Sequence, residues 1–171
     1  MTYPSGAPSP LARPGAGQDL GLVDALAQLS FLVHNALAEI AAQHDLSIIQ
    51  TRLLGVLRDR EPTMNALGRH LGLDKSSVSG LVDRAERRGL VTRSVSASDR
   101  RVVRVSITGT GRHLIEQAAV SFAARIETFT AGLPDADRQL LAQLAARIVA
   151  ADADRRGIDL RTLQADQVPL P

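Results

Sequence analysis

The chain has 171 residues, of which 44% are hydrophobic but only 2% aromatic, and its formal net charge is +2. This length suits one domain with extensions, and its core must be built mainly from aliphatic side chains. The absence of cysteine excludes disulfides, thiolate metal ligands and thiol-based redox sensing.

Residues 1–18 are rich in Gly, Ala and Ser and contain four prolines, Pro4, Pro8, Pro10 and Pro14. Such a composition favours a disordered arm. The arm lacks the charged-then-apolar order of a signal peptide, and no apolar run in the chain approaches the roughly 20 residues of a membrane span. We therefore expect a cytoplasmic protein that makes no contact with a membrane.

Residues 19–43 carry apolar side chains at helical spacing and are predicted to form a helix. One stripe runs along it: Leu22, Leu26, Leu29, Val33, Leu37 and Ile40. Leu20, Leu32 and Ala36 widen the stripe, and such excess apolar surface suggests burial in a second molecule. Residues 47–58 form the next predicted helix, with Ser47 as its N-cap.

Two helices joined by a tight turn are predicted over residues 65–88. Asn65 can cap the first helix, Leu67 and Leu71 share one of its faces, and Gly72 suits its left-handed end. Asp74 is well placed to cap the second helix, whose inward face is apolar: Val78, Leu81, Val82 and Ala85. The opposite face suits contacts with base edges and phosphates, because it carries hydroxyls and charges: Lys75, Ser76, Ser77, Ser79, Asp83 and Arg84. Basic Arg87 and Arg88 precede a terminal glycine, Gly89.

Residues 90–93 and 102–107 have the composition of strands, with a polar tip at residues 94–101 between them. Helix, turn, helix and hairpin in this order are the pattern of a winged helix-turn-helix, a module that reads DNA. Residues 74–104 contain eight Lys/Arg and four Asp/Glu, a net charge of +4, which leaves −2 for the rest of the chain. The positive charge therefore lies where phosphate attraction requires it.

After the hairpin, a long helix capped by Thr108 or Thr110 is predicted to run to about Phe129. A break at Leu133, Pro134 and Asp135 precedes a last helix. That helix has an apolar lining: Leu140, Leu141, Leu144, Ile148 and Val149.

The sequence LDKSSVSGLVDRAERRGLVTR, followed by SDRRVVRVSITGTG, resembles the MarR family of bacterial transcriptional regulators. Asp99, Arg100 and Arg101 match the family's wing motif, and residues 107–111 match its Leu-Thr-x-x-Gly with Ile in place of Leu. The chain departs from the family at Ser96 and Ala97, where Asp-Pro is common. The resemblance extends more loosely over residues 19–151.

The resemblance implies a mainly α fold with a small β-hairpin wing, in which the N- and C-terminal helices form a dimerisation domain. We expect a disordered arm at 1–18, a helical dimerisation region at 19–45 and 108–156, a winged helix-turn-helix at 46–107 and a tail at 157–171. A homodimer would place two recognition helices in successive major grooves of double-stranded DNA. The residues expected at the DNA are Lys75, Ser76, Ser77, Ser79, Arg84, Arg87, Arg88, Asp99, Arg100 and Arg101. Among them, Arg101 would enter the minor groove, with Asp99 holding it in place by a charge-assisted hydrogen bond.

The resemblance also implies a repressor that a small aromatic or phenolic ligand releases from a pseudo-palindromic operator. Polar residues that could border the ligand are His34, His44, Arg52 and His70. The histidines are too scattered to indicate a metal site, and no cofactor is expected. No catalytic motif indicates an enzyme. The alternative is a winged-helix module that binds protein without specific DNA binding.

Overall fold

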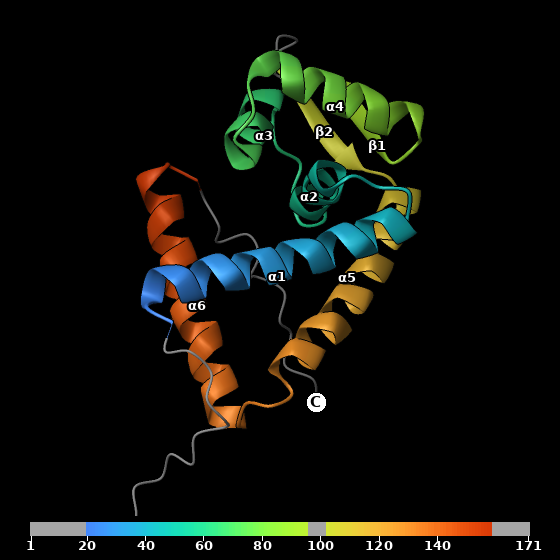
Figure 1. Ribbon diagram of the computed structural model, residues 1–171. Coiled ribbons are helices and arrows are strands. Elements are labelled where there is room, and N and C mark those ends of the chain that lie inside the picture. Colours follow the sequence, from blue (N-terminus) through green and yellow to red (C-terminus); the bar gives the residue numbers. More distant parts are fainter. Residues whose placement is uncertain (1–19, 96–101, 159–171) are drawn as a thin grey trace, which may run out of the picture. The chain divides into compact units, whose positions relative to one another are not determined.

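The computed structural model describes residues 20–95 and 102–158 of the chain. This part contains six helices and one antiparallel hairpin (Figure 1): α1 (Leu22–Gln43), α2 (Ile48–Leu57), α3 (Met64–Leu71), α4 (Lys75–Arg87), β1 (Val91–Val95), β2 (Val103–Ile107), α5 (Gly109–Thr130) and α6 (Asp135–Arg155). The expected class, mainly α with a winged helix-turn-helix, is confirmed.

Contacts between Cα atoms divide the chain into two units, Met1–Leu32 and Val33–Pro171, and the boundary falls inside α1. The described part of the first unit exposes large apolar side chains, among them Val23 and Phe31. By length and composition, α1 could cross a membrane, so the expectation that no segment approaches such a span is wrong. That expectation looked for an unbroken apolar run, whereas the mean hydropathy of α1 is high although polar residues such as Gln28 and His34 interrupt it.

The second unit has an aliphatic core built by α2, α3, α4 and the hairpin. Its largest fully buried side chains are Leu53, Leu54, Leu57, Leu67, Leu81, Val78, Val82 and Val105. Each of these contributes on the order of 1.5–3 kcal/mol of burial free energy. The four residues predicted to face inward from α4 are all at most 1% exposed, so the predicted orientation of that helix is confirmed.

Side-chain caps fix where the short helices begin. The Ser47 hydroxyl accepts the backbone N–H of Gln50, whose side chain in turn accepts the N–H of Ser47, a capping box that confirms the predicted N-cap of α2. Thr63, and not Asn65, caps α3 by accepting the N–H of Ala66 at 3.2 Å. The prediction for Asn65 is wrong because α3 begins at Met64, which places Asn65 inside the first turn.

Glycines end both helices of the helix-turn-helix in the predicted left-handed conformation. Gly72 has φ 68° after α3, and Gly89 has φ 69° after α4. A side chain at either position would strain the backbone. These two residues therefore set the tight turn before α4 and the turn from α4 into the hairpin.

The base of the hairpin is joined to the start of α5. Val91 pairs with Ile107 in the antiparallel register. Thr108 caps α5 by accepting the N–H of Gly111 at 3.1 Å, and its hydroxyl donates to the carbonyl of Gly89 at 2.7 Å. A Cβ on Gly111 would lie 2.1 Å from the Leu90 carbonyl oxygen. The Thr-x-x-Gly part of the sequence motif therefore locks the wing onto α5.

Candidate nucleic-acid interface

The start of α4 is organised around one carboxylate. Asp74 accepts the backbone N–H of Ser77 at 2.9 Å and the hydroxyls of Ser76 and Ser77 at 2.6 and 2.7 Å. These bonds, led by the Ser76 hydroxyl, hold the pKa of Asp74 well below its usual range. Both hydroxyl protons are thereby directed at Asp74, which leaves the oxygens of Ser76 and Ser77 as acceptors toward an outside group.

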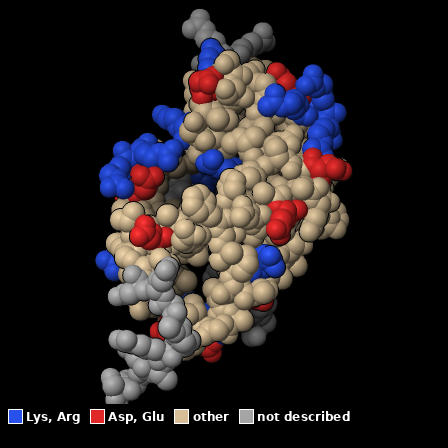
Figure 2. Space-filling view, viewed as in Figure 1, with Lys and Arg blue, Asp and Glu red and all other residues tan. Residues whose placement is uncertain are grey.

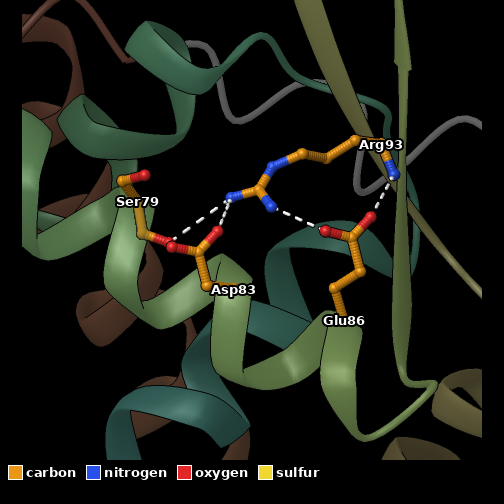
Figure 3. A network of polar contacts seen from close by, with 4 residues as sticks. All are labelled: Ser79, Asp83, Glu86 and Arg93. Atoms are coloured by element: carbon orange, nitrogen blue, oxygen red, sulfur yellow. Dashed lines mark hydrogen bonds and ion pairs between the residues drawn. The ribbon is translucent and has the colours of Figure 1, made fainter.

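Arg93 on β1 forms ion pairs with both Asp83 and Glu86 of α4 (Figure 3). Its guanidinium lies 2.6 Å from Asp83 Oδ1 and 2.6 Å from Glu86 Oε2, and it also donates to the carbonyl of Ser79 at 3.4 Å. Partial burial by itself would lower the pKa of Arg93, but the hydrogen bonds and charges of Asp83 and Glu86 outweigh it and raise the pKa. The backbone N–H of Arg93 also donates to Glu86, so strand and helix are held together at two points.

The remaining basic side chains of α4 are exposed. Lys75, Arg84 and Arg87 face solvent, and none of them makes an ion pair within residues 20–95 and 102–158. Figure 2 shows Lys and Arg side chains gathered over the C-terminal end of α4. A shallow hollow of about 360 Å³, bordered by Ser76, Ser77 and Arg84, lies between α2 and α4. Positive charge and acceptor oxygens thus share one accessible face.

Arg88 differs from these basic residues because its side chain contacts another part of the chain. Its guanidinium donates to the backbone carbonyl of Asp45 at 2.6 Å, in the turn that joins α1 to α2. Asp45 itself has φ 53°, a conformation that few non-glycine residues adopt. Arg88 therefore fastens the end of α4 to that turn, a contact that sequence reasoning did not anticipate.

The wing is anchored to the loop before α3. The N–H of Val105 donates to the carbonyl of Pro62 at 3.0 Å, and Arg104 donates to the carbonyl of Glu61 at 3.0 Å. The tip of the wing, with Asp99, Arg100 and Arg101, lies outside the described residues.

Of the four residues predicted to border a ligand, two lie on a common cavity. Arg52 and His70 line a space of about 690 Å³ between α2, α3 and the end of α6, whereas His34 and His44 are not among its lining residues. His70 Nε2 lies 3.3 Å from the guanidinium of Arg60 in the same wall. No group of three or more His, Cys, Asp or Glu residues in the described part of the chain could hold a metal ion.

Sequence reasoning missed Arg93 and most of the basic residues of the cavity. Asp83 and Glu86 are three apart on α4, so they share a face, and Arg93 follows closely on the next strand. This spacing could have predicted the ion pairs that Arg93 forms with Asp83 and Glu86. The arginines of the cavity come from segments almost 100 residues apart, and no local pattern brings them together.

The comparisons with known proteins give a family model and a curated relative that each cover part of the chain. The model of the MarR family matches residues 44–102. The uncharacterised HTH-type transcriptional regulator YhbI of Bacillus subtilis (strain 168) is 34% identical over 80 residues, which cover 46% of this chain. The match spans 52% of that relative, about half of its length.

Two solved structures share the fold over most of their length. The chain matches NadR in complex with 4-hydroxyphenylacetate at 22% identity with a TM-score of 0.63, covering 80% of this chain and 97% of that one. It matches the Staphylococcus aureus MepR–DNA complex at 20% identity with a TM-score of 0.64, covering 78% of this chain and 99% of that one. At these identities the likeness establishes the fold alone.

Proposed function

We propose that this chain is a dimeric, sequence-specific, DNA-binding transcriptional regulator and not an enzyme, and the match of the MarR family model to residues 44–102 supports this proposal. The observation that carries the proposal is the exposed face of α4, where Lys75, Arg84 and Arg87 are accessible while Asp83 and Glu86 form ion pairs with Arg93. A face with net positive charge and outward acceptors suits both phosphates and base edges. Such a regulator works in the cytoplasm, where the DNA is.

In this proposal α4 enters the major groove. Arg84 reads a base edge, and Ser76 and Ser77 accept hydrogen bonds from the exocyclic amino groups of adenine or cytosine, because their own protons are directed at Asp74. Ser79 lies at the edge of the contact, and Lys75 and Arg87 bind phosphates.

The wing continues the contact beyond α4. Arg101 enters the minor groove, Asp99 holds its guanidinium, and Arg100 follows the backbone. The MepR–DNA complex supports this docking only as an example of the same fold on DNA.

A second copy of the chain is proposed to cover the apolar surfaces of the terminal helices. On α6, Leu140, Leu144 and Ile148 are 53%, 44% and 59% exposed, and α1 exposes Leu22 and Phe31. Polar residues at intervals along α1 favour a protein partner over lipid for this helix. A twofold dimer sets two α4 helices about 34–36 Å apart, as a pseudo-palindromic site requires.

The cavity between α2, α3 and the end of α6 is proposed as the effector site of a repressor. Its volume of about 690 Å³ is that of a small-molecule site. It lies between the DNA-binding helices and a helix proposed to form the dimer, so that a ligand there can change the separation of the two α4 helices. The ligand of NadR, 4-hydroxyphenylacetate, is an aromatic acid, and we propose an aromatic or phenolic ligand here as well.

A gel shift with the intergenic DNA upstream of the chain's own gene tests this function. We expect a discrete shift at nanomolar protein, with affinity that falls steeply as salt rises because phosphate contacts release counterions. Light scattering of the same sample should give twice the monomer mass. The same weak affinity for that DNA and for random DNA would refute sequence-specific regulation and favour a module that binds protein.

A further inference from the structure

The cavity between α2, α3 and the end of α6 carries far more positive than negative charge. Two of the three segments that line it supply five arginines: Arg52, Arg58, Arg60, Arg155 and Arg156. The carboxylate in the lining is that of Asp152. Figure 2 shows a hollow with Lys and Arg side chains on both sides of it.

Local acids offset only part of this charge. Arg58 lies 3.0 Å from Asp59, while Arg155 and Arg156 share the single carboxylate of Asp152 at 3.4 and 3.3 Å. Arg52 makes neither a hydrogen bond nor an ion pair with the described residues. Even with Arg60 left out of the count, four guanidinium groups face two carboxylates, which leaves two positive charges.

The rest of the wall is apolar. Val56 of α2 and Leu71 of α3 lie on one side, and Ile148, Val149 and Ile158 lie on the other. Ile148 and Val149 are 59% and 56% exposed, so they offer apolar surface to an incoming molecule. The cavity therefore suits a ligand with an apolar body at one end and concentrated negative charge at the other.

We propose that this cavity binds an aromatic or other apolar molecule whose head group carries two negative charges, a phosphate monoester. The proposal rests on the effector site proposed above and specifies the chemistry of its ligand. An excess of two guanidinium charges is more than one carboxylate can neutralise, whereas a phosphate offers three oxygens and nearly two charges. Guanidinium groups bind phosphate through paired hydrogen bonds.

Three probes separate the head group from the body: 1-naphthyl phosphate, 1-naphthoate and inorganic phosphate. Titration calorimetry on the full chain at pH 7.5 should show naphthyl phosphate binding at least tenfold more tightly than either of the others. Its affinity should also fall more steeply with salt than that of naphthoate. Equal or tighter binding of naphthoate would overturn the dianionic head group.

Variants locate the site. Arg52→Gln and Arg156→Gln should each weaken naphthyl phosphate binding about tenfold with unchanged circular dichroism. Arg147→Gln is the matched control, because Arg147 is exposed on α6 but does not line the cavity. An equal loss in the Arg147→Gln variant would mean that charge on α6 attracts the probe without a site and would overturn the proposal.

The two proposals fail separately. If the chain binds naphthyl phosphate but has no affinity for the operator, the ligand proposal is supported and the proposed regulatory function is refuted. If the chain binds its operator and only naphthoate releases it, the regulatory function is supported and the phosphate monoester is refuted as the ligand. If Arg52→Gln weakens operator binding without any ligand and leaves naphthyl phosphate binding unchanged, Arg52 serves DNA binding and the ligand proposal is overturned.

Discussion

The helix-turn-helix and the last helix show opposite patterns of burial. Leu53, Leu67 and Leu81 are at most 1% exposed, whereas Leu144 and Ile148 on α6 are 44% and 59% exposed. Among the described residues, the large apolar side chains of the first region are buried, whereas those of α6 are exposed, and α6 also lacks the single strongly apolar face that α3 and α4 have. This contrast is what the proposed dimer requires, in which a second copy covers the apolar surfaces of the terminal helices.

The largest predicted effect comes from removing a leucine side chain from each of these two regions. Leu81→Ala should lower the free energy of unfolding by about 2–5 kcal/mol, because it opens a cavity in the core. Leu144→Ala, the matched change on α6, should instead raise the dimer dissociation constant and leave the packing of the helix-turn-helix intact. Urea denaturation and sedimentation at several concentrations measure the two effects, and equal loss of unfolding free energy with unchanged dimerisation would remove the distinction.

The junction of wing and α5 provides the next test. Gly111→Ala should lower the free energy of unfolding by about 1–3 kcal/mol or more, because the new Cβ would collide with the Leu90 carbonyl. Gly109→Ala is the control, since no neighbouring atom lies within 4 Å of the place that its new Cβ would take. Thermal unfolding should therefore rank Gly111→Ala well below Gly109→Ala, and similar melting temperatures would contradict a locked junction.

The helix-turn-helix could be predicted from the sequence because the patterns that indicate it lie within short segments. The spacing of Val78, Leu81, Val82 and Ala85 predicts the buried face of α4, and Gly72 predicts the turn before it. Contacts between distant segments could not be predicted in this way. Arg88 reaches the carbonyl of Asp45, 43 residues earlier, and the cavity joins α2 to the end of α6. A backbone carbonyl carries no side-chain signature, so nothing in the sequence marks it as a partner.

A substitution of Arg93 tests whether the charge on α4 determines the affinity for DNA. Arg93→Gln should weaken operator binding about tenfold, because it releases the carboxylates of Asp83 and Glu86 next to the reading face. Fluorescence anisotropy with the operator duplex measures the change. The triple variant that adds Asp83→Asn and Glu86→Gln should recover most of the affinity, and a failure to recover would mean that the bridge acts through the position of the wing and not through charge.

The smallest effect concerns pH and the start of α4. The pKa of Asp74 is lower in the folded chain than its unfolded value of about 3.9. Its contribution to stability is therefore complete above that value and is lost as pH falls through the folded pKa. The difference in unfolding free energy between the parent and Asp74→Asn should be constant from pH 5 to 8 and shrink below about pH 4. A difference that grows on acidification would contradict the assigned hydrogen bonds.

The most direct test of the account compares two exposed arginines on one operator duplex. Arg84 lies on the face of α4 proposed to read DNA, and Arg147 lies on α6, away from it. We predict that Arg84→Ala weakens operator binding by about 1–3 kcal/mol and relaxes its preference over random DNA, while Arg147→Ala changes neither. Unchanged affinity and specificity in the Arg84→Ala variant, with the fold intact, would contradict the claim that α4 is the recognition helix.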